Sequence, residues 1–140
     1  MKKAILIFAL SVPGAYSFAQ CDKTVTYFSG KAEFMDESGK VDRSEEGKVV
    51  VKVTQSHITL MHNDDDNDTM EGAITEKVCD WKTPFKIGKT TFNTSLVERS
   101  GESNDASVSI EGKDGKLVIL INLKNKGKIL KLMPDNYKDE

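Results

Sequence analysis

Residues 106–123 read ASVSIEGKDGKLVILINL, and this stretch decides the fold. In its second half, Leu117, Ile119, Ile121 and Leu123 recur at every second position, which places them on one face of a β-strand. The first half, Ala106–Ile110, is a second strand candidate. Asp114-Gly115 lies between the two, and this dipeptide between alternating apolar runs is among the strongest short signals for a β-hairpin. The stretch therefore predicts two antiparallel strands joined by a tight turn.

The rest of the chain has the same pattern of strands and turns. Short runs rich in β-branched and aromatic residues are separated by glycine, aspartate and asparagine, as strands separated by turns are. No segment sustains a helical apolar period for ten residues. The other expected strands are 24–28, 31–35, 49–53, 57–61, 73–79, 90–98 and 128–133.

This pattern predicts an all-β protein, a single antiparallel domain of about eight or nine short strands over residues 20–134. Sequential hairpins favour an up-and-down arrangement. It can close as a barrel, lipocalin-like in outline, or fold into a β-sandwich, and the alternation is the same in both. Pro134 ends the last expected strand, and residues 135–140 are expected to be a polar C-terminal tail.

Residues 1–19 have the pattern of a signal peptide that is removed. Two lysines precede the nine-residue apolar run Ala4–Val12, and Ser17 and Ala19 are the small residues that a signal peptidase reads. Nine residues are too few to span a bilayer core of about 30 Å. We therefore expect cleavage after Ala19 and export to a periplasmic or extracellular location. The compact Met-Lys-Lys start is typical of a bacterial signal.

Two cysteines follow the expected cleavage site, Cys21 and Cys79. In an oxidising compartment a disulfide between them is the first interpretation. It would close a loop of roughly sixty residues, which the chain-entropy model values at about 4 kcal/mol. The alternatives are a lipid attached to Cys21, although Gln20 stands where such sites have a small residue, and two free thiols.

The charge balance argues against nucleic acid as a partner. The formal net charge is −2, and loss of residues 1–19, which hold two lysines and no acid, makes it −4. After the signal, no apolar run is longer than the five residues Leu117–Ile121, so no transmembrane segment is expected in the mature protein.

An acidic stretch, residues 62–69, is the strongest candidate for a metal site. Asp64, Asp66 and Asp68 have the alternating spacing that opens a calcium loop, and His62 precedes them. However, Thr69 stands where that loop needs glycine, and Thr75 where it needs the closing glutamate. The favoured interpretation is a solvated hairpin loop, with no metal and no cofactor.

The segment Cys79–Phe85 holds the main aromatic concentration. Trp81 and Phe85 could form an exposed platform for a sugar ring or a partner, which makes them candidate ligand-binding residues. Alternatively, Trp81 packs on the disulfide or plugs one end of the core.

No catalytic constellation is recognisable. The chain has two histidines, five residues apart, and no Gly-x-Ser-x-Gly elbow. We therefore expect an exported, non-catalytic β-domain that binds a small apolar ligand or a protein partner. An envelope-associated structural protein and a carboxylate-dependent extracellular hydrolase are the alternatives. An interior cavity of several hundred Å³ lined by apolar side chains would favour the ligand.

Overall fold

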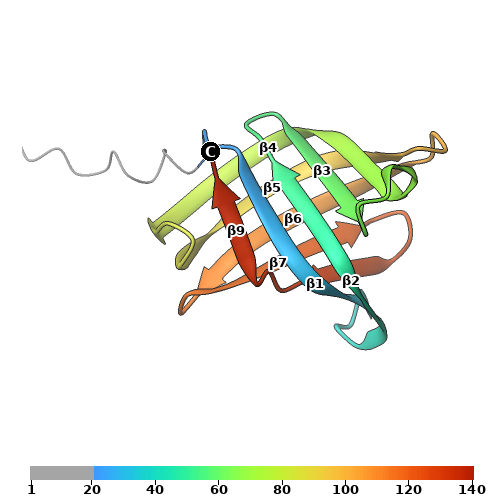
Figure 1. Cartoon of the computed structure of the whole chain (residues 1–140), viewed down its shortest axis with the longest axis horizontal. Coiled ribbons are helices and arrows are strands. Elements are labelled where there is room, and N and C mark those ends of the chain that lie inside the picture. Colours follow the sequence, from blue (N-terminus) through green and yellow to red (C-terminus); the bar gives the residue numbers. More distant parts are fainter. Residues whose placement is uncertain (1–20) are drawn as a thin grey trace, which may run out of the picture.

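The computed structural model describes residues 21–140, so the expected signal peptide and its cleavage site lie outside the described residues. The described chain is almost entirely β-strand (Figure 1). Its elements are β1 (Val25–Asp36), β2 (Val41–Val53), β3 (His57–His62), the short 3₁₀ helix η1 (Asp66–Asp68), β4 (Thr69–Thr83), β5 (Ile87–Glu98), β6 (Ser103–Lys113), β7 (Lys116–Leu123), β8 (Lys128–Leu132) and β9 (Asn136–Asp139).

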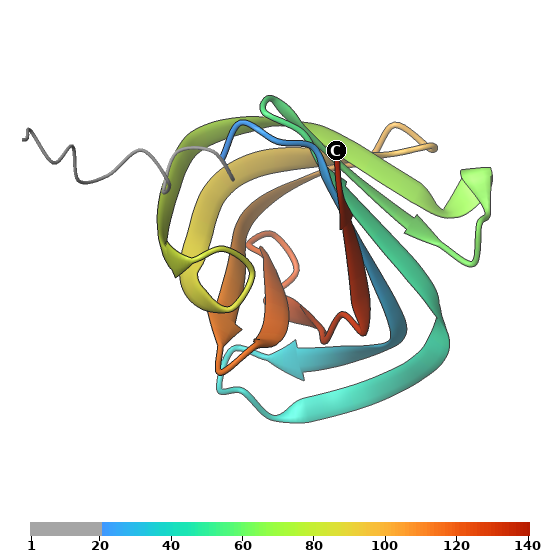
Figure 2. The same cartoon turned by 60° about the vertical axis from the view of Figure 1, so that its left-hand side comes forward.

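The strands form a closed antiparallel barrel. Each strand from β1 to β7 pairs with the next, and β8 pairs back onto β1, so eight strands make a complete ring (Figure 2). The all-β prediction is confirmed, and of the two closures left open the barrel is the one formed. Several strands are longer than expected, up to the 15 residues of β4.

A β-bulge explains the extra length of β1 and β2. Gly30 interrupts the pairing between Ser29 and Lys31 without ending the strand, so the two segments expected on either side of it form the single strand β1. On β2, Gly47 lies in the same bulge, with φ at +149°. The strand continues beyond it to Val41, through charged residues that the sequence analysis did not assign to a strand.

Residues 135–140, which were expected to be a tail, instead contain β9. It pairs with β1 from Phe28↔Asn136 to Val25↔Asp139. β8 pairs with the other half of β1, from Ala32 onward, so β8 and β9 lie end to end along the same edge. Pro134 lies in the break between them. β9 has no pairing with β7, so it is an extra strand beside the barrel.

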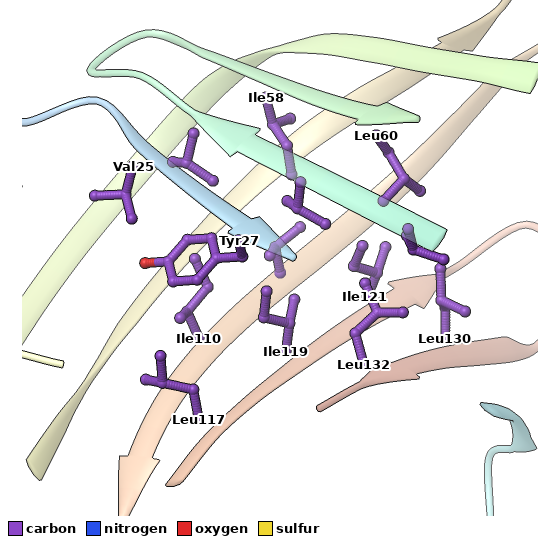
Figure 3. Close-up of a cluster of buried hydrophobic side chains, with 14 of the residues drawn as sticks. Val25, Tyr27, Ile58, Leu60, Ile110, Leu117, Ile119, Ile121, Leu130 and Leu132 are labelled. Carbon is purple, nitrogen blue, oxygen red and sulfur yellow. The ribbon is translucent and has the colours of Figure 1, made fainter. Parts of the chain in front are cut away.

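Alternating side chains fill the barrel interior. Ile119 and Ile121 of β7 are fully buried, as the alternation in residues 106–123 predicts, and Leu132 and Ile58 meet them from β8 and β3 (Figure 3). The packed core lies toward the end of the barrel where β1 begins, which we call the closed end. The opposite end, where β1 turns into β2, we call the mouth.

Candidate functional site

An aromatic group blocks the closed end. Trp81 is 4% exposed, and its Nε1 donates a hydrogen bond of 2.7 Å to Thr90 Oγ1. Phe85, from the turn after β4, is also buried; its ring centroid lies 6.5 Å from that of Trp81 and 4.3 Å from that of Tyr137 on β9, on which it stacks. These residues are therefore not an exposed platform. Trp81 instead plugs one end of the core, which was the other interpretation of this segment.

Two glycines make room for Trp81. Gly88 and Gly112 face each other on β5 and β6, and Trp81 pairs with Gly88. A Cβ atom at Gly112 would lie 2.7 Å from Trp81 Cζ3, and one at Gly88 would lie 2.5 Å from Trp81 Cα. The indole ring therefore packs against the backbone of Gly88 and Gly112, and a side chain at either position would collide with Trp81.

The disulfide predicted between Cys21 and Cys79 is confirmed and lies at the same end. The two Cα atoms are 6.1 Å apart. Lys77 Nζ donates to Cys21 O at 2.8 Å and to Thr54 O at 3.3 Å, and burial lowers the pKa of this lysine. The bridge thus connects the segment before β1 to β4, which is not its neighbour in the barrel. A disulfide is consistent with export into an oxidising compartment.

The mouth, in contrast, holds a cavity of about 660 Å³. This volume is within the range of small-molecule sites, and an eight-stranded barrel is just wide enough either to be filled by side chains or to hold one small ligand. The apolar part of the wall comes from β1 to β4, β7 and β8, and consists of Ala32, Phe34, Val49, Leu60, Met70, Leu123 and Leu130.

Charged side chains complete the wall near the entrance. The interior-facing positions of several strands change from apolar to charged as the strand reaches the mouth. On β2, Val49 is followed toward the mouth by Glu45 and Arg43, which pair with Ala32 and Phe34 of β1. The charged residues that line the cavity are Asp42, Arg43, Glu45, His62, Asp68, Glu98, Lys126 and Lys128, which we call the rim.

A second bulge brings adjacent β2 residues to the same cavity. Phe34 pairs with Arg43 while Met35 pairs with Val41, so Asp42 has no partner on β1. In a regular strand, Asp42 and Arg43 would point to opposite faces. The extra residue redirects the chain, and both side chains line the cavity.

The rim residues form ion pairs with one another. The nitrogen–oxygen distances are 3.2 Å for Arg43–Glu45, 3.5 Å for Lys128–Asp42 and 3.8 Å for Lys126–Glu98. His62 and Asp68 form a hydrogen bond of 2.8 Å. All these side chains are partly exposed, and pairs of this kind contribute about 0–1 kcal/mol each. A ligand can therefore rearrange them with little loss of stability.

The residues of the acidic stretch lie in two places: some line the cavity and others are exposed on the outer surface. His62 and Asp68 are hydrogen bonded at the mouth, whereas Asp64 binds Lys48 at 3.1 Å on the exposed surface. Asp65 accepts a hydrogen bond from Asn67 N and begins η1. Within residues 21–140, no three or more His, Cys, Asp or Glu side chains come together in a group that could hold a metal ion.

The rim residues on β2, β5 and β8 were missed in the sequence analysis. A signal did exist on β2, because Arg43 and Glu45 continue the two-residue spacing of the interior residues Val49, Val51 and Val53. Charged residues in a strand are usually assigned to the solvent face. Only the pairing of Arg43 and Glu45 with Phe34 and Ala32 on β1 shows that these two side chains lie on the interior face.

Comparisons of the chain with protein-family models, curated proteins and solved structures found no match. Across residues 21–140, no helix has the length and apolar character needed to cross a membrane. The cavity and its rim are therefore the features of the molecule from which a function can be inferred.

Proposed function

We propose that this protein is an exported, non-catalytic carrier that binds one small, largely apolar ligand in the mouth cavity. The observation that carries the proposal is the asymmetry of the barrel. Its closed end is filled by Trp81 and Phe85, while its mouth encloses about 660 Å³ beside seven apolar side chains. A core that served only stability would be packed at both ends. We also propose a periplasmic or extracellular location in a bacterium, which the disulfide and the N-terminal sequence support.

The cavity can supply a useful affinity. Burial of a methylene group contributes about 0.8 kcal/mol, so roughly ten buried methylenes contribute on the order of 8 kcal/mol before the cost of association. That cost offsets part of the gain. Since 8 kcal/mol corresponds to about 1 μM before this cost is subtracted, we expect dissociation constants larger than about 1 μM for a single-chain ligand of about twelve carbons.

The alternatives receive less support. A glycoside hydrolase needs one carboxyl group that donates a proton to the leaving group and a second that acts beside it. In the rim, each carboxylate instead contacts a basic side chain, at nitrogen–oxygen distances of 2.8–3.8 Å. A lipid at Cys21 would have favoured the envelope-associated alternative. The disulfide occupies that sulfur atom.

A pair of tryptophan substitutions on β4 tests the proposal. Met70 is half-buried in the wall of the cavity, and Ala73 is exposed on the outside of the same strand. We expect the neutral fluorescent probe N-phenyl-1-naphthylamine to bind the wild-type protein one to one. Met70→Trp should weaken binding by about tenfold or more, because the indole fills the cavity. Fluorescence titration measures both effects.

Ala73→Trp is the matched control, and it should bind the probe as the wild type does. Thermal melting of both variants checks that the barrel is intact. Absence of probe binding to the wild-type protein, or equal binding by folded Met70→Trp, would contradict the proposed cavity.

A further inference from the structure

Arg43 has an unusual position for an arginine. It lies on the interior-facing register of β2, paired with Phe34, and its guanidinium carbon is 4.4 Å from the centroid of the Phe34 ring. Phe34 itself is part of the apolar wall. This distance places the guanidinium over the ring, where cation–π attraction stabilises it. A charged group thus lies directly beside the apolar surface that would hold the body of a ligand.

The guanidinium also has unused hydrogen-bond donors. An arginine carries five N–H groups in a rigid planar fork. Within residues 21–140, the polar partner of Arg43 is Glu45, whose Oε1 lies 3.2 Å from Nε. The two terminal amino groups have no acceptor in that part of the chain. The side chain lines the cavity and is 61% exposed, so these donors are accessible to a ligand there.

The other cations of the rim are loosely held. Lys128 lies 3.5 Å from Asp42, and Lys126 lies 3.8 Å from each of Glu98 and Glu102. These ion pairs are longer than a strong charge-assisted hydrogen bond of about 2.7–2.9 Å. Both lysines can therefore turn toward an anion at the mouth. The rim carboxylates belong to these same ion pairs, so the preference for an anion rests on the unused donors of Arg43.

We propose that the ligand is a single-chain amphiphile with an anionic head, and that Arg43 holds this head at the mouth while the chain lies in the cavity. This inference rests on the proposed function, because it names the class of ligand for the same site. A carboxylate and a phosphate monoester both match the planar fork of arginine. Lys126 and Lys128 add positive charge around the head.

Four compounds with the same twelve-carbon chain test the inference. Dodecanoate, dodecyl phosphate, dodecanol and dodecylamine are titrated, each below its micellar concentration, against protein loaded with N-phenyl-1-naphthylamine. We expect one or both anions to displace the probe at concentrations at least tenfold lower than dodecanol, and the amine to be the weakest. The two anions show whether the head is of the carboxylate or the phosphate type.

The outcomes separate the two proposals. If no compound displaces the probe and the probe itself does not bind, the proposed function fails. If dodecanol binds as tightly as the anions, the proposal of a ligand-binding cavity is supported, and the proposal of an anionic head group is contradicted. Preference for dodecylamine would also overturn the inference and would assign the rim carboxylates to a cationic head.

Substitutions of the two arginines in the described chain complete the test. Arg43→Gln should weaken dodecanoate binding by about tenfold and leave dodecanol binding unchanged, because only the charged head loses its partner. Arg43→Lys should restore part of the affinity, since it keeps the charge but not the fork. Arg99→Gln is the control. Arg99 is near the same end of the barrel, where its Nε donates to Asp66 O, but it does not line the cavity. If Arg43→Gln weakens the binding of dodecanoate and dodecanol equally, Arg43 supports the structure of the site and does not hold the anionic head.

Discussion

Trp81→Ala is expected to lower the free energy of unfolding by about 3–5 kcal/mol. The side chain is almost fully buried at the closed end, and the substitution removes both its apolar surface and the hydrogen bond to Thr90. Gly88 and Gly112 beneath the ring have no side chains that could fill the space left behind. Urea denaturation measures the change, and a fall in melting temperature of more than about 10 °C should accompany it.

Trp81→Phe is the matched control. It keeps most of the ring and loses the Nε1 donor, so we expect a smaller loss of about 1–2 kcal/mol. Because the mouth is at the opposite end, folded Trp81→Phe should bind N-phenyl-1-naphthylamine as the wild type does. A loss below about 1 kcal/mol in Trp81→Ala would mean that the closed end is not held by this residue.

Removal of the disulfide, by Cys21→Ser together with Cys79→Ser, should lower the free energy of unfolding by about 2–5 kcal/mol. The two cysteines are 58 positions apart, so the bridge restricts a long loop of the unfolded chain. In the folded protein, it also brings Cys21 O within reach of Lys77, which bonds to the turn before β3 at Thr54. Loss of the bridge frees this segment as well.

The double substitution avoids leaving an unpaired thiol that could form dimers. Denaturation of the wild-type protein in the presence of a reductant should give the same stability as the double variant. If the oxidised wild type and the double variant unfold at the same urea concentration, the bridge contributes nothing to stability.

The fold class was predictable because strand alternation is a local property. Residues 106–123 show it directly, and the structure buries Leu117, Ile119 and Ile121 as the pattern requires. The closure into a barrel was not predictable. A sandwich and a barrel bury the same alternate residues, and the pairing that decides between them joins β8 to β1, at opposite ends of the chain.

The candidate site was the least predictable part, and the reason is physical. Its polar residues Arg43, Glu98 and Lys128 lie at strand ends, where charge is ordinarily exposed whichever way the side chain points. The bulge at Asp42 also brings this residue to the same cavity as its neighbour Arg43, which regular alternation along a strand does not predict. The aromatic segment and the acidic segment were proposed as candidate sites because residues of one chemical type are concentrated in each. The cavity is instead assembled from single residues on many strands.

The break at Pro134 gives the two ends of the molecule different tendencies to unfold locally. β9 is hydrogen bonded to β1 alone, so it can detach while the eight-stranded ring remains closed. Release of β8 would open the ring itself, since its five residue pairs with β1 complete the closure. Detachment of β9 breaks fewer strand pairings than release of β8, and it would separate Tyr137 from Phe85 of the aromatic plug. The mouth keeps its shape during such fluctuations, which favours a preformed site over one that must assemble around its ligand.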